Sequence, residues 1–166
     1  MTVIVVMGVS GAGKTTVGQA LAERLGVPYA EADDFHSSAN IAKMGAGEPL
    51  TDADRAPWLV SIAGWISEHP SGVVTSSALK RAYRDVLRDG GPVWFLHLDG
   101  TRELLAARVA ARREHFMPVS LLDSQLATLE PLQPDEHGVV ISADRPVDMV
   151  VEVALQTFRT TRNQLR

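Results

Sequence analysis

The segment Gly8–Thr15, with the sequence GVSGAGKT, constrains the fold more than any other part of the chain. It matches the pattern G-x-x-x-x-G-K-[ST], follows the apolar run Val3–Met7 and precedes a helix-like stretch from Thr16 to Leu25. Glycines let the backbone wrap around a polyphosphate with its N–H groups pointing inward, and the next helix adds unpaired N–H donors and a positive dipole end. The segment therefore predicts a phosphate-binding loop between a buried strand and a helix.

A simple glycine-rich turn is the structural alternative to this interpretation. Such a turn needs one or two glycines, and it gives no reason for Lys14 and Thr15 to open the helix. In a phosphate loop, by contrast, Lys14 supplies a mobile cation for the β- and γ-phosphates and Thr15 a hydroxyl for Mg²⁺. We therefore favour the phosphate site.

The composition indicates a single domain that acts on a small molecule. The chain has 166 residues, no cysteine, and 16 basic against 20 acidic side chains, which gives a net charge of −4. The charge argues against a nucleic-acid surface, and the lack of cysteine fits a reducing compartment. No apolar run approaches the length that spans a bilayer, and no basic leader precedes the first run, so we expect a cytoplasmic protein without a membrane partner.

Five apolar runs without polar alternation are separated by helix-like segments. Such a pattern is typical of a parallel sheet that is covered on both faces. We therefore predict an α/β fold of three layers, with a five-stranded parallel sheet and helices on both faces, in one domain over residues 1–166. The runs are Val3–Met7, Val27–Ala30, Val73–Thr75, Val93–Leu98 and Val139–Ile141.

Acidic residues follow the second run, where parallel sheets bind their ligands. Glu31 and Asp33 share a face if the strand continues, so that one could bind Mg²⁺ while the other meets a substrate hydroxyl. Alternatively, the acids only end the strand and cap a turn. Because Asp34 makes three acids beside a polyphosphate, the cluster would be repulsive without a cation or a transferable proton, and we favour a functional role.

Thr51 and Asp54 resemble a capping box for a helix that runs to Ile66. Pro57 is tolerable only in the first turn of such a helix, which places Arg55 at the helix N-terminus. There its guanidinium group and the backbone donors could hold a carboxylate together. A surface ion pair between Asp54 and Arg55 explains the pattern equally well.

Basic residues mark two further segments. Lys80 and Arg84 share one helical face after the third run, where a solvated basic face is the alternative. Arg108 and Arg112 stack on a helix predicted over Arg102–Arg113, with no acid between them, as expected for a segment that closes over a nucleotide. The helix dipole alone explains Arg112 but not Arg108.

The last third of the chain is predicted to be mainly structural. Helices are expected over Ser120–Leu129 and Val147–Phe158, and the turn Ser142–Pro146 follows the fifth run at a place where it could wall an adenine.

Four blocks of sequence together resemble the gluconokinase family of P-loop kinases. The most specific is Asp33–Leu59, which contains Lys43-Met44 and ends in Pro57-Trp58-Leu59, and the others are Ser77–Asp85, Arg112–Phe116 and Leu121–Glu130. The resemblance extends from the glycine loop to about Pro146. It implies a shikimate-kinase-like P-loop NTPase fold with a mobile lid at about residues 112–125, a homodimer, and the reaction of ATP with D-gluconate to give ADP and 6-phospho-D-gluconate.

The resemblance also implies roles for individual residues. Asp33 would orient or deprotonate the attacking hydroxyl, Arg112 would belong to the lid over the phosphates, and the candidate metal ligands are Thr15 and Glu31. The residues expected to hold ATP–Mg are Gly8, Ser10, Gly11, Ala12, Gly13, Lys14, Thr15, Thr16 and Arg108. Those expected to line the gluconate pocket are Asp33, His36, Lys43, Arg55, Arg84 and His115, with the arginines facing the carboxylate.

The chain departs from the family pattern at two places. Ser37 follows His36 where many members have proline, and Ser76-Ser77-Ala78 stands where many have Cys-Ser-Ala. Three alternatives stay open on the sequence: a kinase for another hydroxy acid such as shikimate, a nucleotide-dependent switch protein, and a nucleoside monophosphate kinase. Against a switch, the sequence has no Asn-Lys-x-Asp guanine motif. Against a monophosphate kinase, it has no recognisable pocket for a second base.

Overall fold

The computed structural model describes residues 1–111 and 119–164, and its centre is one parallel sheet. The strand order is β2-β3-β1-β4-β5, and every neighbouring pair is parallel. All five predicted strands are confirmed, although β2 begins two residues later than predicted. The strands are β1 (Val3–Met7), β2 (Tyr29–Glu31), β3 (Gly72–Thr75), β4 (Val93–Asp99) and β5 (Gly138–Ser142).

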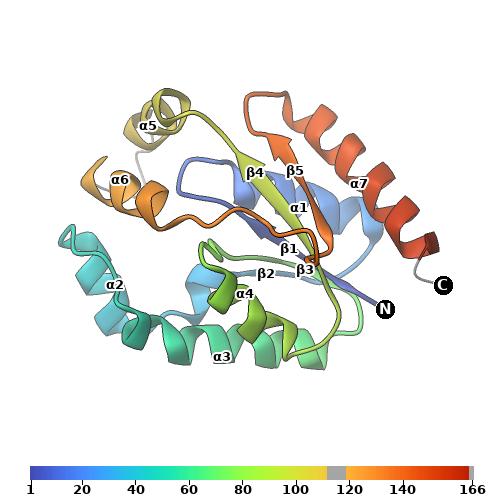
Figure 1. The fold of residues 1–166 in the computed structure, drawn as a ribbon, viewed down its shortest axis with the longest axis horizontal. Coiled ribbons are helices and arrows are strands. Elements are labelled where there is room, and N and C mark those ends of the chain that lie inside the picture. The colour runs from blue at the N-terminus through green and yellow to red at the C-terminus, as the bar shows by residue number, and fades with distance from the viewer. Residues whose placement is uncertain (112–118, 165–166) are drawn as a thin grey trace.

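Helices cover both faces of this sheet, so the three-layer prediction is confirmed (Figure 1). Helices α1 and α7 lie on one face and α3 and α4 on the other, while α5 and α6 lie beyond one end of the strands (Figure 1). The helices are α1 (Lys14–Leu25), α2 (Ser38–Gly45), α3 (Asp52–Glu68), α4 (Arg81–Arg88), α5 (Arg102–Ala111), α6 (Val119–Thr128) and α7 (Val147–Gln164), with a 3₁₀ turn η1 (Ala32–Phe35). In the described ranges, no helix is both long and apolar enough to cross a membrane.

The central strand β1 contributes to two hydrophobic cores. Ile4 and Val6 pack with the side chains of α1 and α7, whereas Val3, Val5 and Met7 pack with those of α3 and α4. All five side chains are at most 1% exposed. Because both faces of β1 are buried, the strand shows no polar alternation, and its carboxyl end presents the phosphate loop from a fixed position.

Helix α3 has the predicted capping box, but its proline does not lie in the first turn as predicted. Thr51 Oγ1 accepts the N–H of Asp54 at 3.1 Å, and the Asp54 carboxylate accepts the N–H of Thr51 at 2.8 Å. Pro57 lies within the helix, beyond its first turn, and α3 continues to Glu68. A proline there removes one backbone hydrogen bond. Burial of the apolar face offsets this loss, through Trp58, Leu59, Ile62 and Ile66.

Candidate active site

The phosphate loop leaves backbone donors available at the start of α1. Gly13 caps this helix in the left-handed conformation (φ 90°, ψ 24°), and no side chain accepts the N–H groups of the first turn at the cap. Gly11 is also left-handed, and a Cβ there would lie 2.9 Å from the carbonyl oxygen of Leu105. The strand, loop and helix therefore form the predicted arrangement, in which orphan N–H groups meet the positive end of a helix dipole.

Two groups of the loop contact other parts of the protein. Lys14 Nζ donates to the carbonyl oxygens of Gly8 at 2.8 Å and Val9 at 3.1 Å. The N–H of Ser10 donates to Oε1 of Gln125 in α6 at 2.8 Å. Lys14 thus lies across the loop, in the region where a polyphosphate would contact it.

The two predicted metal ligands lie together beside the loop. Burial alone would raise the pKa of the Glu31 carboxyl, but hydrogen bonds from Thr15, Tyr29 and Thr75, together with the charge of Lys14, lower it overall. Glu31 is therefore ionised next to the Thr15 hydroxyl. No cluster of three or more His, Cys, Asp or Glu side chains suited to a metal occurs in the described residues. A hydroxyl and one carboxylate fit Mg²⁺, which binds few protein oxygens and completes its shell with water and phosphate.

A cavity of about 250 Å³ adjoins the other side of the loop. Arg108 of α5 borders it, donating from Nη2 to the carbonyl oxygen of Ala143 at 2.7 Å and from Nη1 to that of Gly11 at 3.5 Å. The lining includes the turn that the sequence predicted to wall an adenine, and consists of Gly11, Ala12, Gly13, Thr16, Val17, Leu98, Arg108, Ala143, Arg145, Val147 and Val150. A half-apolar cavity against the loop suits a nucleoside.

Asp33 and His36 lie at the end of β2, on the same side of the sheet as α3. Trp58 Nε1 donates to the carbonyl oxygen of Ala32 at 2.7 Å, which fixes the η1 turn that carries Asp33. The Asp33 carboxylate is exposed. The His36 ring stacks on Trp58, with 4.2 Å between the centroids, and burial lowers the pKa of His36, with Asp33 acting to raise it and Arg55 to lower it. Asp33 and Arg55 are therefore both close enough to the His36 ring for their charges to act on it.

Lys43 of α2 lies beside the first turn of α3, which carries Asp54 and Arg55. Lys43 Nζ donates to Asp54 Oδ2 at 2.7 Å, so the ion pair of Asp54 is formed with Lys43 and not with Arg55. Hydrogen bonds from Lys43 and Thr51 lower the pKa of Asp54 to about 2.

Arg55 keeps part of its donor capacity. Its Nη1 donates to the carbonyl oxygen of Leu50 at 2.9 Å and to the hydroxyl of Tyr83 at 3.0 Å. Within residues 1–111 and 119–164, these are the hydrogen bonds of its guanidinium group, so Nε and Nη2 remain for an anion. The Tyr83 hydroxyl itself donates to Asp52.

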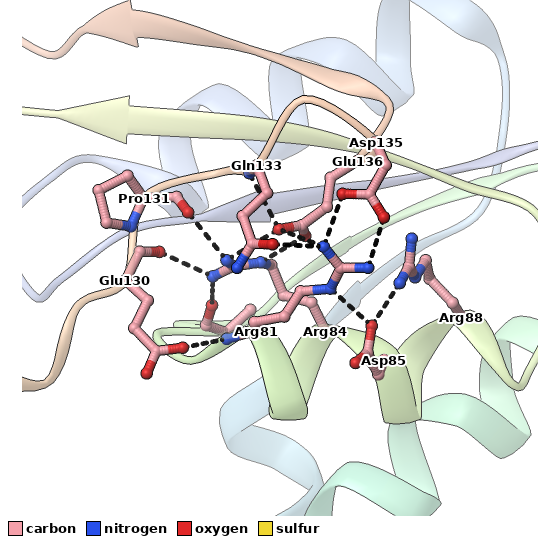
Figure 2. Close-up of polar contacts among 10 residues, drawn as sticks. Arg81, Arg84, Asp85, Arg88, Glu130, Pro131, Gln133, Asp135 and Glu136 are labelled. Carbon is pink, nitrogen blue, oxygen red and sulfur yellow. Dashed lines mark hydrogen bonds and ion pairs between the residues drawn. The ribbon is translucent and has the colours of Figure 1, made fainter.

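The structure contradicts the prediction that Arg84 lines the gluconate pocket. The side chain is 0% exposed, and its Nε and Nη2 donate to the Glu136 carboxylate at 2.6 and 3.0 Å. The remaining N–H groups donate to three carbonyl oxygens, those of Ala78, Glu130 and Pro131. Figure 2 shows this arginine enclosed between α4 and the segment that leads to β5. With all five N–H groups used inside the protein, Arg84 has none left for a substrate.

The neighbouring basic residues of α4 are also paired (Figure 2). Arg81 donates to the Asp135 carboxylate from two nitrogens, at 2.7 and 2.8 Å, and to Asp85 at 2.9 Å, while Arg88 also contacts Asp85. The basic segment after β3 is therefore an ion-pair network that holds α4 to residues 130–136. The ligand-binding interpretation was wrong for Arg84, and local spacing could not show this, because Asp135 and Glu136, which pair with Arg81 and Arg84, lie 54 and 52 positions away in sequence.

Some predicted residues lie outside the described part of the chain, and others were missed. Arg112 and His115 are outside it, and of the predicted lid only residues 119–125 are described, at the start of α6. Tyr83 and Gln125 were missed as neighbours of the site. Both occur in the blocks that carried the resemblance, which was the available signal, but no local pattern gave either of them a role.

Comparisons with known proteins show which family this chain resembles. The family model described as shikimate kinase matches residues 10–133. The gluconokinase of Gluconobacter oxydans is 49% identical over 161 residues, which cover 94% of this chain and 90% of that protein.

Solved structures separate two degrees of similarity. A gluconokinase from Sinorhizobium meliloti superposes with a TM-score of 0.92 at 44% identity and covers 99% of this chain and 95% of its own. A shikimate kinase from Bacteroides thetaiotaomicron gives a TM-score of 0.69 at 18% identity, over 95% of this chain and 98% of its own. The second similarity shows the fold alone.

Proposed function

This chain belongs to the gluconokinases within the shikimate kinase family, and we propose that it transfers the γ-phosphoryl group of ATP to D-gluconate, giving ADP and 6-phospho-D-gluconate. The similarity to curated gluconokinases over nearly the whole chain carries this proposal. The geometry supports it, because the phosphate loop follows β1 while Asp33 and His36 follow β2, at the carboxyl edge of the same parallel sheet.

Catalysis is proposed to come from positioning and charge neutralisation, since phosphoryl transfer needs little covalent chemistry from the protein. The loop amides and Lys14 bind the phosphates, and Arg108 and the lid residue Arg112 complete the nucleotide site. Thr15 and Glu31 would hold Mg²⁺, which neutralises charge on the phosphates when it is bound. The exposed Asp33 carboxylate orients the attacking hydroxyl and accepts its proton.

The carboxylate of gluconate is proposed to bind Arg55. Its Nε and Nη2 form a planar pair of donors that suits a carboxylate. His36 and Lys43 would bind hydroxyl groups nearby, with His115 as a further candidate contact. Arg84 cannot bind the carboxylate together with Arg55, because it is buried with Glu136. The acceptor is therefore inferred from the family and from Arg55.

We further propose that residues 112–125 form a lid on a single domain, and that the enzyme is a cytoplasmic homodimer. The cysteine-free composition suits a reducing compartment, and the dimer follows from the resemblance to the family. Light scattering after size exclusion should give about twice the chain mass of 17.9 kDa.

An acceptor panel tests the proposed reaction. ADP release would be measured with D-gluconate, shikimate, gluconolactone and water, at saturating ATP and Mg²⁺. We expect strong acceleration by D-gluconate alone. Acceleration by shikimate but not by D-gluconate would make shikimate the substrate. Failure of every acceptor to accelerate ADP release would favour a nucleotide-dependent switch.

A further inference from the structure

Helix α6 contacts the phosphate loop through the side chain of Gln125. Its Oε1 accepts the backbone N–H of Ser10 at 2.8 Å, across 115 positions of sequence. An N–H group of this loop is expected to donate to a phosphate. Here it donates instead to a side chain that comes from a helix beyond the end of the sheet (Figure 1).

Ser10 is not among the residues that line the nucleoside cavity beside the loop. The lining of that cavity includes Gly11, Gly13 and Thr16. The lysine of such a loop binds the β- and γ-phosphates. Here Lys14 Nζ donates to the carbonyl oxygens of Gly8 and Val9, the two residues that directly precede Ser10. We therefore expect the Ser10 N–H to lie near the terminal phosphoryl group of a bound nucleotide.

Helix α6 makes contacts with the rest of the protein on both sides of Gln125. On the N-terminal side Leu122 is fully buried, and Asp123 accepts a hydrogen bond from Arg102 Nε of α5 at 2.6 Å. On the C-terminal side the N–H of Glu130 donates to the carbonyl oxygen of Leu79 at 2.7 Å. From this helix, the rotatable amide of Gln125 can offer the loop either an acceptor, Oε1, or two donors on Nε2.

We propose that Gln125 is a positioning residue that recognises the terminal phosphoryl group of ATP. While the loop is empty, Gln125 accepts the Ser10 N–H. When ATP binds, the phosphoryl group takes this N–H, and the Gln125 amide turns to donate an Nε2–H to the same group. ADP lacks that group and leaves the Gln125–Ser10 bond in place. This inference rests on the proposed use of ATP and adds a residue that distinguishes substrate from product.

Binding of MgATP and MgADP, measured by calorimetry without an acceptor, tests the proposal. In Gln125→Ala we expect the Kd for ATP to rise about tenfold, since one hydrogen bond to a charged group is lost, and the Kd for ADP to stay within about twofold. Gln125→Glu keeps an acceptor for Ser10 but cannot donate and adds a negative charge. It should therefore weaken the binding of ATP more than Gln125→Ala does and again leave the binding of ADP unchanged.

Gln156→Ala on the exposed face of α7 is the matched control, and it should bind both nucleotides as the unmodified protein does. Hydrogen exchange supplies a second measurement: without nucleotide, amides of residues 119–128 should exchange faster in Gln125→Ala. Equal weakening of ATP and ADP would make Gln125 a structural support only, and unchanged binding of both would also overturn the proposal. Absence of gluconate-dependent ADP release would overturn the proposed reaction instead, because the binding experiment uses no acceptor.

Discussion

The phosphate loop and the two arginines predicted to bind the acceptor differ in how their geometry arises. The loop is eight consecutive residues between β1 and α1, and its donors are backbone groups that point inward because glycines allow the turn. The sequence predicts the same role for Arg55 and Arg84, yet within the described residues Arg55 keeps Nε and Nη2 unbonded while Arg84 is 0% exposed against Glu136. A site built from backbone can be predicted from a local pattern. A site built from long side chains depends on partners that a local pattern does not contain.

The largest effect is expected at the loop. Lys14→Met should lower turnover by on the order of 100- to 1,000-fold, because a cation that stabilises charge in the transition state is lost. ADP release gives the rate, and circular dichroism should show an unchanged fold. Activity within tenfold of the unmodified enzyme would contradict the role of Lys14 and would remove the contrast between the two regions.

Arg84→Met should destabilise the protein without specifically weakening gluconate binding. Removing one partner of a buried ion pair leaves the Glu136 charge uncompensated, which costs about 3–5 kcal/mol. For a chain of this length, the thermal midpoint should fall by roughly 6–20 °C. Differential scanning calorimetry measures the midpoint, and the KM for gluconate is measured well below it.

The double variant Arg84→Met/Glu136→Leu is the control for this experiment. It removes both charges and should recover part of the lost midpoint. If Arg84→Met kept its thermal midpoint and raised the KM for gluconate instead, Arg84 would bind gluconate and would not be a buried structural residue.

Arg55→Ala should raise the KM for gluconate by roughly 10- to 100-fold, since a charge-assisted hydrogen bond to the carboxylate is lost. The KM for ATP should change by less than about twofold. Initial rates with each substrate varied in turn provide both constants. Equal changes in the two KM values would remove Arg55 from the acceptor pocket. Arg81→Ala, on the paired face of α4, is the comparison that should leave both constants unchanged.

The smallest effect concerns the partly buried Lys43–Asp54 pair. The pKa of Asp54 is lowered to about 2 in the folded protein, so its stabilising contribution is present above the ordinary pKa of 3.8 and is lost as the pH falls towards 2. Asp54→Asn should therefore lower the urea midpoint slightly at pH 6, and the difference from the unmodified protein should shrink by pH 3. A difference that does not depend on pH would assign the effect to the helix cap alone.

Most of the fold could be predicted because its signals are local. The five strands and the capping box of α3 were predicted from runs and spacings of a few residues, and their bounds differ from the predicted ones by at most two residues. The passage of α3 through Pro57 could not be predicted in this way. It depends on the burial of Trp58 and Ile62 against the sheet, which offsets the missing hydrogen bond.

The candidate site divides along the same line. Thr15 and Glu31 were predicted as a pair and lie in hydrogen-bond contact, because the loop and the end of β2 meet at one edge of a parallel sheet. The links from Gln125 to Ser10 and from Arg84 to Glu136 span 115 and 52 positions, and neither could be predicted from spacing.

The sequence by itself determined that this protein has a parallel sheet with a phosphate loop at its carboxyl edge, because glycine geometry and strand burial act over a few neighbouring residues. Only the tertiary structure decided which charged side chains remain available to a ligand. A guanidinium group binds the nearest well-placed oxygens, and for Arg84 those oxygens come from residues 78, 130, 131 and 136, which only folding brings together.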